Sequence, residues 1–68
     1  MIMSVEEIDK NAGTVYHFLF HRGSLSLRKI GELTHKNESM IYLSLGWLLR
    51  EDKIRIYLKD GEWYFDLK

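Results

Sequence analysis

A chain of 68 residues forms one small domain, and on folding it buries only about 60% of the surface that its unfolded chain exposes. It contains no cysteine, which excludes disulfide bonds and thiolate metal sites as supports for a core of this size. Ten basic and ten acidic residues give a net charge of zero, so the chain lacks the basic excess that attracts nucleic acid.

The first element expected along the chain is a helix that begins after Ser4. Ser4 and Glu7 form a capping box, in which the serine side chain accepts a hydrogen bond from the backbone N–H three residues later. Apolar residues then recur with helical spacing, at Val5, Ile8, Ala12, Val15 and Leu19. Gly23 is expected to end this helix, because glycine readily adopts the left-handed conformation found after many helices.

Two further helices are expected between residues 26 and 50, separated by a polar turn over residues 34–37. Ser26 can cap the second helix, and either Asn37 or Ser39 can cap the third. The apolar positions of the second helix are Leu27, Ile30 and Leu33. The positions of the third helix expected to face the core are Ile41, Leu45, Leu48 and Leu49.

The end of the chain predicts a β-hairpin. Asp60-Gly61 lies between two alternating segments and favours a type I′ turn, which needs positive φ at both central residues. A two-residue loop also fixes the register of the strands. This register places three apolar pairs on one face: Ile54–Leu67, Ile56–Phe65 and Leu58–Trp63. On the opposite face it places Tyr57 against Tyr64 and predicts two ion pairs, Arg55–Asp66 and Lys59–Glu62.

Helix, short helix, turn, helix and hairpin together predict an α+β fold, a helix-turn-helix followed by a wing, in one domain over residues 1–68. The succession of SLSLRKIGELT, IYLSLGWLLREDKI and a hairpin resembles the winged helix-turn-helix superfamily. The run LGWLLRE at residues 45–51 and Asn11-Ala12-Gly13 resemble, more closely, a bacterial family of small stand-alone winged helix-turn-helix proteins of uncharacterised function. The resemblance implies three helices, a C-terminal β-hairpin wing and a transcription-related role, with no catalytic residue and no known ligand.

The first function class that follows is binding to double-stranded DNA. In a winged helix the third helix enters the major groove, and here its outer side presents Ser39, Tyr42 and Arg50. Residues 22–59 hold eight Lys or Arg against four Asp or Glu, a net charge of +4. Because the expected wing tip is acidic, we expect weak binding, mainly to the DNA backbone. The phosphate contacts would come from Arg28, Lys29 and Lys36, which are otherwise ordinary solvated side chains.

The second function class is a protein-interaction module, most simply a homodimer, on the same scaffold without DNA binding. Met40, Leu43 and Trp47 form a second apolar strip on the third helix, and Gly46 beside Leu43 would allow a close backbone approach. Phe18 and Phe20 on the first helix could widen this strip. Either the strip packs into the core of its own chain, or it binds a partner, and the sequence leaves both alternatives open.

Other function classes find little support in the sequence. His17 and His21 are spaced to share a metal ion, but no third ligand joins them at motif spacing, so we expect no metal and no cofactor. Without a nucleophile elbow or a phosphate-binding loop, we expect neither an enzyme nor a small-molecule substrate. The sequence shows neither a membrane-spanning apolar run nor a signal-peptide pattern, so we expect no membrane association and a cytoplasmic location.

Overall fold

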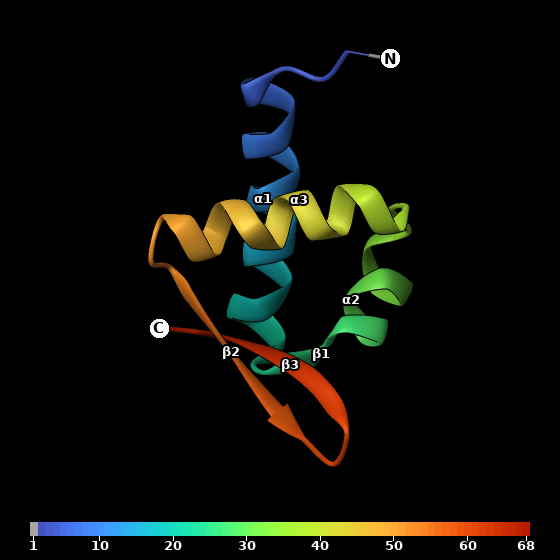
Figure 1. Ribbon diagram of the computed structural model, residues 1–68, viewed down its shortest axis with the longest axis vertical. Coiled ribbons are helices and arrows are strands. Elements are labelled where there is room, and N and C mark those ends of the chain that lie inside the picture. The colour runs from blue at the N-terminus through green and yellow to red at the C-terminus, as the bar shows by residue number, and fades with distance from the viewer. Residues whose placement is uncertain (1) are drawn as a thin grey trace.

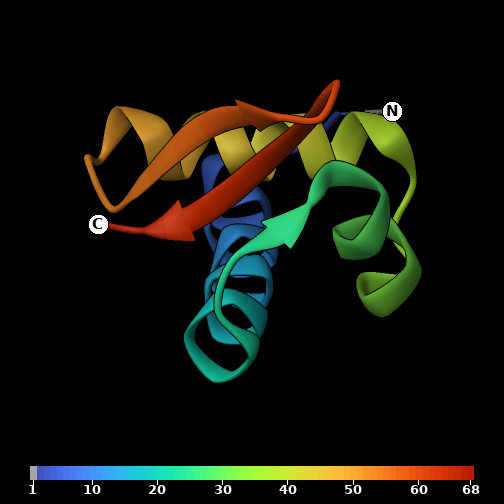
Figure 2. The same cartoon turned by 90° about the horizontal axis from the view of Figure 1, so that it is seen from below.

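The computed structural model describes residues 2–68, which form three helices and a three-stranded sheet (Figure 1). In chain order the elements are α1 (Val5–Arg22), β1 (Leu25–Ser26), α2 (Leu27–Thr34), α3 (Glu38–Arg50), β2 (Ile54–Lys59) and β3 (Glu62–Leu67). Figure 1 shows α3 crossing α1, with α2 near the start of α3 and the hairpin of β2 and β3 after its end. Viewed from below, the hairpin runs along α3, and β1 lies between the hairpin and α2 (Figure 2). The predicted α+β winged helix is confirmed.

The helix ends follow the predicted capping residues. The side chains of three N-cap residues accept hydrogen bonds from the backbone N–H three residues later: Ser4 at 3.2 Å, Ser26 at 3.1 Å and Asn37 at 2.9 Å. Gly23 follows α1 with a φ of 83°, and its N–H donates to the carbonyl of Leu19 at 2.9 Å. The expected helix limits therefore rest on local hydrogen bonds that the sequence specifies.

The antiparallel sheet has the strand order β1-β3-β2, so β3 is its central strand and β2 is an edge. The six residue pairs between β2 and β3 are those that the sequence predicts. Asp60 and Gly61 have φ values of 51° and 78°, which confirms a turn with two positive φ angles. Ser24-Leu25 is too short for more than a bridge strand, and the structure has a two-residue strand one position later, β1, which pairs Leu25 with Phe65 and Ser26 with Tyr64.

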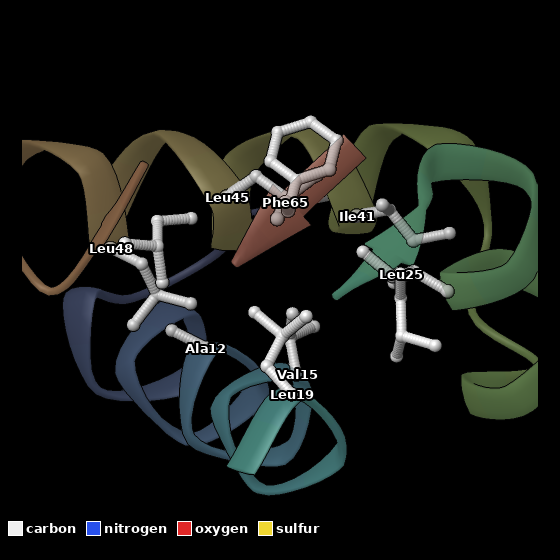
Figure 3. Packing of buried hydrophobic residues seen from close by; sticks show 10 residues of the cluster. Ala12, Val15, Leu19, Leu25, Ile41, Leu45, Leu48 and Phe65 are labelled. Atoms are coloured by element: carbon white, nitrogen blue, oxygen red, sulfur yellow. The ribbon is translucent and has the colours of Figure 1, made fainter. Parts of the chain in front are cut away.

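The core lies where α1, α3 and the base of the hairpin meet (Figure 3). Its buried apolar side chains are Ala12, Val15, Leu19, Leu25, Ile30, Ile41, Leu45, Leu48, Ile54 and Phe65. Ser44 is also fully buried, and its hydroxyl donates to the carbonyl of Met40 at 2.8 Å, which satisfies the polar group within its own helix. All six elements thus contribute to, or adjoin, one apolar cluster.

Two apolar residues expected in the core are exposed. Leu49 is 38% exposed, because it lies at the edge of the buried arc of α3 and points toward the part of the hairpin that stands clear of the core. Val5 is 60% exposed, because the first turn of α1 projects beyond the crossing with α3 (Figure 1). The periodicity was right for the other predicted core positions of α3, Ile41, Leu45 and Leu48, which are buried, and wrong for Leu49 and Val5.

One of the two predicted ion pairs across the hairpin forms. Arg55 and Asp66 approach to 3.2 Å. Lys59 and Glu62 are register partners, but within residues 2–68 the Glu62 carboxylate pairs with Arg28 at 4.0 Å and accepts a hydrogen bond from the Tyr64 hydroxyl at 3.4 Å. The predicted position of Lys59 opposite Glu62 is therefore confirmed, but the predicted ion pair between them is not formed, and the Nζ of Lys59 lies 6.0 Å from the centre of the Tyr64 ring instead.

Candidate protein and nucleic-acid interface

The outer side of α3 is a solvent-exposed surface of largely apolar character. Ser39, Leu43, Gly46 and Arg50 follow one line along it, and all four are exposed. Tyr42 and Leu43 are 55% and 44% exposed. A helix that reads DNA usually offers Arg, Lys, Asn or Gln to the bases from its N-terminal part, whereas the basic residue here, Arg50, closes the helix.

The apolar face of the hairpin is covered at its base and uncovered toward its tip. Ile54 and Phe65 are buried, but Leu58 and Trp63 are 59% and 49% exposed. Of the six residues of β2, only Ile54 is buried, so most of this strand extends past the core. The apolar pattern therefore continues beyond the part of the hairpin that packs on α3.

These two surfaces are neighbours, and a hollow of about 390 Å³ lies between them. Tyr42, Gly46 and Leu49 line it from α3, and Ile56 and Trp63 line it from the hairpin. We call the exposed apolar side chains of this region the α3–wing face, which comprises Tyr42, Leu43, Leu49, Ile56, Leu58 and Trp63. An exposed apolar patch that spans two elements is typical of an interaction site.

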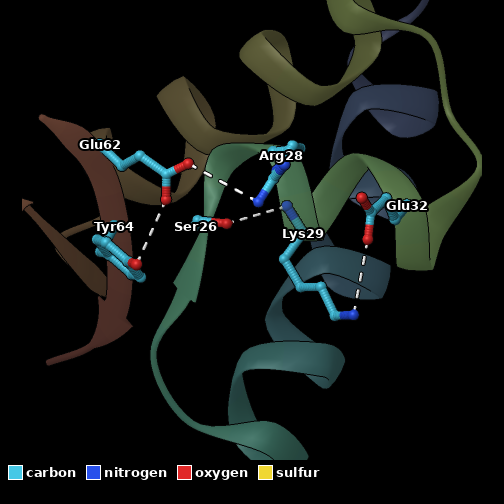
Figure 4. Close-up of polar contacts among 6 residues, drawn as sticks. All are labelled: Ser26, Arg28, Lys29, Glu32, Glu62 and Tyr64. Atoms are coloured by element: carbon cyan, nitrogen blue, oxygen red, sulfur yellow. Dashed lines mark hydrogen bonds and ion pairs between the residues drawn. The ribbon is translucent and has the colours of Figure 1, made fainter. Parts of the chain in front are cut away.

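Arg28 and Lys29, two of the basic residues proposed for phosphate contacts, are exposed but already have partners (Figure 4), and the third, Lys36, is half-buried. Arg28, whose side chain is 78% exposed, lies 4.0 Å from Glu62, and Lys29 lies 3.6 Å from Glu32. Such exposed ion pairs are weak and can exchange for phosphate. The Nζ of Lys36 donates to the side-chain oxygen of Asn11 on α1.

The structure brings only some of the candidate DNA residues together. Arg28, Lys36 and Tyr42 border one hollow of about 340 Å³ between α2 and α3, together with the acidic Glu38. Ser39 is exposed in the first turn of α3. Arg50 is 12 residues after Glu38, so it lies about 18 Å farther along the helix and belongs to a different region.

The apolar strip proposed as an interface, Met40, Leu43 and Trp47, lies partly against the core and partly in solvent. Trp47 packs against the edge of the core, and its indole N–H donates to the carboxylate of Asp9 on α1 at 3.2 Å. Met40 is half-buried, while Leu43 faces solvent. A Cβ atom added to Gly46 would meet nothing within 4 Å, so the backbone there is open to a partner.

Sequence reasoning missed the distal wing residues as site candidates. Ile56, Leu58 and Trp63 were expected to share one face, but not to leave it uncovered. The sequence carried only an indirect signal, the three apolar pairs along the whole length of the strands, and nothing in it shows where the cover of this face stops.

The described residues 2–68 contain no group of three or more His, Cys, Asp or Glu side chains placed to hold a metal ion. The rings of His17 and His21 lie 4.3 Å apart on α1. Within the same part of the chain, none of the helices has the length and apolar character needed to cross a membrane.

Comparison with known proteins agrees with this architecture. The winged helix-turn-helix domain family DUF2582 matches residues 3–67. The uncharacterized protein MJ1608 of Methanocaldococcus jannaschii is 37% identical over 65 residues, which cover 91% of each chain. The solution NMR structure of protein BT2368 from Bacteroides thetaiotaomicron is similar with a TM-score of 0.85 and 28% identity, covering 96% of this chain and 79% of that one.

Proposed function

Because the chain belongs to the winged helix-turn-helix domain family DUF2582, we propose that it uses the surfaces a winged helix offers to DNA, here the α3–wing face, to bind a second copy of itself. It then works as a homodimeric protein-interaction module in the cytoplasm and catalyses no reaction. The observation that carries this proposal is the exposed apolar character of the α3–wing face.

The chemistry of this face favours protein over DNA as its occupant. Tyrosine, tryptophan and leucine bury apolar area against another protein, whereas base edges and phosphates require donors and positive charge. The tip of the wing, which would approach the DNA backbone, carries Asp60 and Glu62. A negatively charged tip repels phosphate and is compatible with a protein partner.

Sedimentation of the wild type and two matched variants tests the proposal. The wild type is expected to sediment as a dimer at high concentration, and Leu58→Glu as a folded monomer, because a charge would enter the interface. Phe20→Glu is the control, since Phe20 is a large side chain 65% exposed on α1 and outside the α3–wing face. A monomeric wild type, or a dimer that survives Leu58→Glu, would disprove this use of the face.

A second candidate function is weak binding to double-stranded DNA in a transcription-related role. The observation that favours it is the exposure of Arg28 and Lys29 in the first turn of α2, outside the α3–wing face. There they are placed to contact phosphates without reading bases.

A salt-dependent shift assay on mixed-sequence duplexes tests this second function. The double variant Lys29→Glu, Lys36→Glu is expected to bind every sequence less well and to show a flatter salt dependence. Lys10→Glu, an exposed charge change on α1, is the control. Absence of binding by the wild type at low salt would remove this function, and selective loss for one sequence would contradict a backbone-only mode.

A further inference from the structure

We propose that the homodimer forms by antiparallel pairing of α3 with α3 of the second copy. The two-fold axis crosses the outer side of α3 midway between Leu43 and Gly46. This inference rests on the proposed self-association and adds the arrangement of the two chains. Three features of α3 support it: the spacing of the exposed residues on its outer side, the glycine at the centre of that side and the charges at the two ends of the helix.

The exposed line of α3 has a spacing that reads the same in both directions. Its members Ser39, Leu43, Gly46 and Arg50 are separated by four, three and four residues. A two-fold axis perpendicular to the helices therefore superposes the line on itself, with Leu43 opposite Gly46 of the second copy and Ser39 opposite Arg50. This self-complementarity is what an isologous interface requires, and each contact then occurs twice.

Gly46 gives the pairing room for close contact. It is an exposed glycine inside a helix, where alanine would be more favourable for an isolated chain. Its missing side chain leaves open space, and a hollow of about 400 Å³ adjoins it, bordered by Ile8, Leu43 and Trp47. Leu43 of the second copy, which projects from the facing helix, fits over this position.

The charges at the two ends of α3 select the antiparallel direction. Glu38 opens the helix and Arg50 ends it, and within residues 2–68 neither forms an ion pair. Antiparallel pairing brings Arg50 of each copy beside the N-terminal end of the other α3, where Glu38 lies, and it also aligns the two helix dipoles favourably. Parallel pairing would place like charges together at both ends.

The same two-fold axis accounts for the wing. Tyr42 and Leu49 both lie on the side of α3 that faces the hairpin. With a two-fold axis perpendicular to both helices, the hairpin-facing sides of the two α3 helices lie on the same side of the pair. Tyr42 of one chain therefore approaches Leu49 of the other. The exposed Trp63 of each wing lines the same hollow as Tyr42 and Leu49 and therefore borders this interface.

Reversal of the terminal charges tests the pairing by analytical ultracentrifugation. Glu38→Arg and Arg50→Glu are each expected to weaken dimerisation at least tenfold, and the double variant is expected to recover most of this loss. Circular dichroism of each variant verifies that the helices remain formed. Wild-type affinity in both single variants, or a double variant as weak as the worse single one, would overturn the antiparallel arrangement.

These outcomes separate the pairing from the self-association on which it rests. If Leu58→Glu abolishes the dimer and the charge variants leave it intact, the copies meet through the wing, and the α3 pairing is wrong while the proposed function stands. If the wild type is a monomer, both fail.

A matched pair of glycine variants tests the close contact. Gly46→Ala is expected to raise the melting temperature of the diluted monomer, since alanine favours the helix, and to weaken dimerisation at least tenfold. Gly13→Ala on α1 is the control, because its added Cβ also meets nothing within 4 Å. It should raise the melting temperature and leave dimerisation unchanged. Unaltered dimerisation of Gly46→Ala would overturn the close approach at this position.

Discussion

Gly61 occupies the second central position of the hairpin turn with a φ of 78°, a conformation that β-branched side chains strongly disfavour. Gly61→Val is therefore expected to lower the free energy of unfolding by more than about 1 kcal/mol in urea denaturation. Gly13→Ala, in the middle of α1, should instead raise it by roughly 0.5–1 kcal/mol. An unchanged midpoint for Gly61→Val would contradict strain at the turn as the source of the effect.

The environment of the Tyr64 hydroxyl shifts its pKa. Partial burial raises the pKa of Tyr64 above its ordinary value of 10.0, and the negative charge of Glu62 raises it further. Because the unfolded chain then releases this proton first, stability is expected to fall as the pH rises above 10.0 toward the folded pKa.

Glu62→Gln should lower the pKa of Tyr64 only part of the way, since burial, the largest single cause, remains in the variant. The pKa of Tyr64 is measured as the difference between the spectrophotometric titration of each protein and that of the same protein carrying Tyr64→Phe. Glu32→Gln, which removes a carboxylate that pairs with Lys29 on α2, should leave this pKa unchanged. If Glu62→Gln leaves the pKa of Tyr64 unchanged, the assigned electrostatic effect is wrong.

At the scale of the elements, α2 depends on its cap, because a helix of eight residues has few internal hydrogen bonds. Ser26 is buried, and its hydroxyl oxygen accepts a hydrogen bond from the backbone N–H of Lys29. Ser26→Ala is expected to cost about 1 kcal/mol in the free energy of unfolding. Ser4→Ala, at the projecting end of α1, should cost less, and equal costs would contradict the dependence of α2 on its cap.

The elements were predictable from sequence because their signals are local. Asp60-Gly61 fixes the register of β2 and β3, and the cap Ser26 fixes where α2 begins. For α3 the sequence offered two caps, Asn37 and Ser39, and the structure shows that Asn37 is the cap. For β1 the sequence predicted at most a bridge strand at Ser24-Leu25, and its partner was not predictable, because Phe65 lies 40 residues after Leu25 and only the fold brings them together.

The candidate site was predictable only in part, because exposure depends on how far the core extends. Leu43 and Gly46 were singled out from their positions on α3, and both are on its outer side. Leu58 and Trp63 were not singled out, because alternation shows that they share a face and does not show where the covering helix stops. The ion pair between Arg28 and Glu62 likewise joins elements that only the fold places together.

At the scale of the whole molecule, a small core and a large exposed apolar face predict that stability depends on protein concentration. Dimerisation stabilises the folded state by mass action, so the melting temperature should rise over a hundredfold range of concentration. Leu43→Glu should remove this dependence while the chain remains folded, since Leu43 is 44% exposed. A wild-type melting temperature independent of concentration would contradict self-association.

The position of β2 at the edge of the sheet has a consequence for solubility. Its outward backbone groups are available to any extended chain, which makes such an edge a template for aggregation. Arg55 and Lys59 alternate along this strand with their side chains exposed, and they hinder the approach of another strand because like charges repel. Replacing both with threonine, a residue that favours extended structure, should lead to fibrillar precipitates on prolonged incubation near neutral pH.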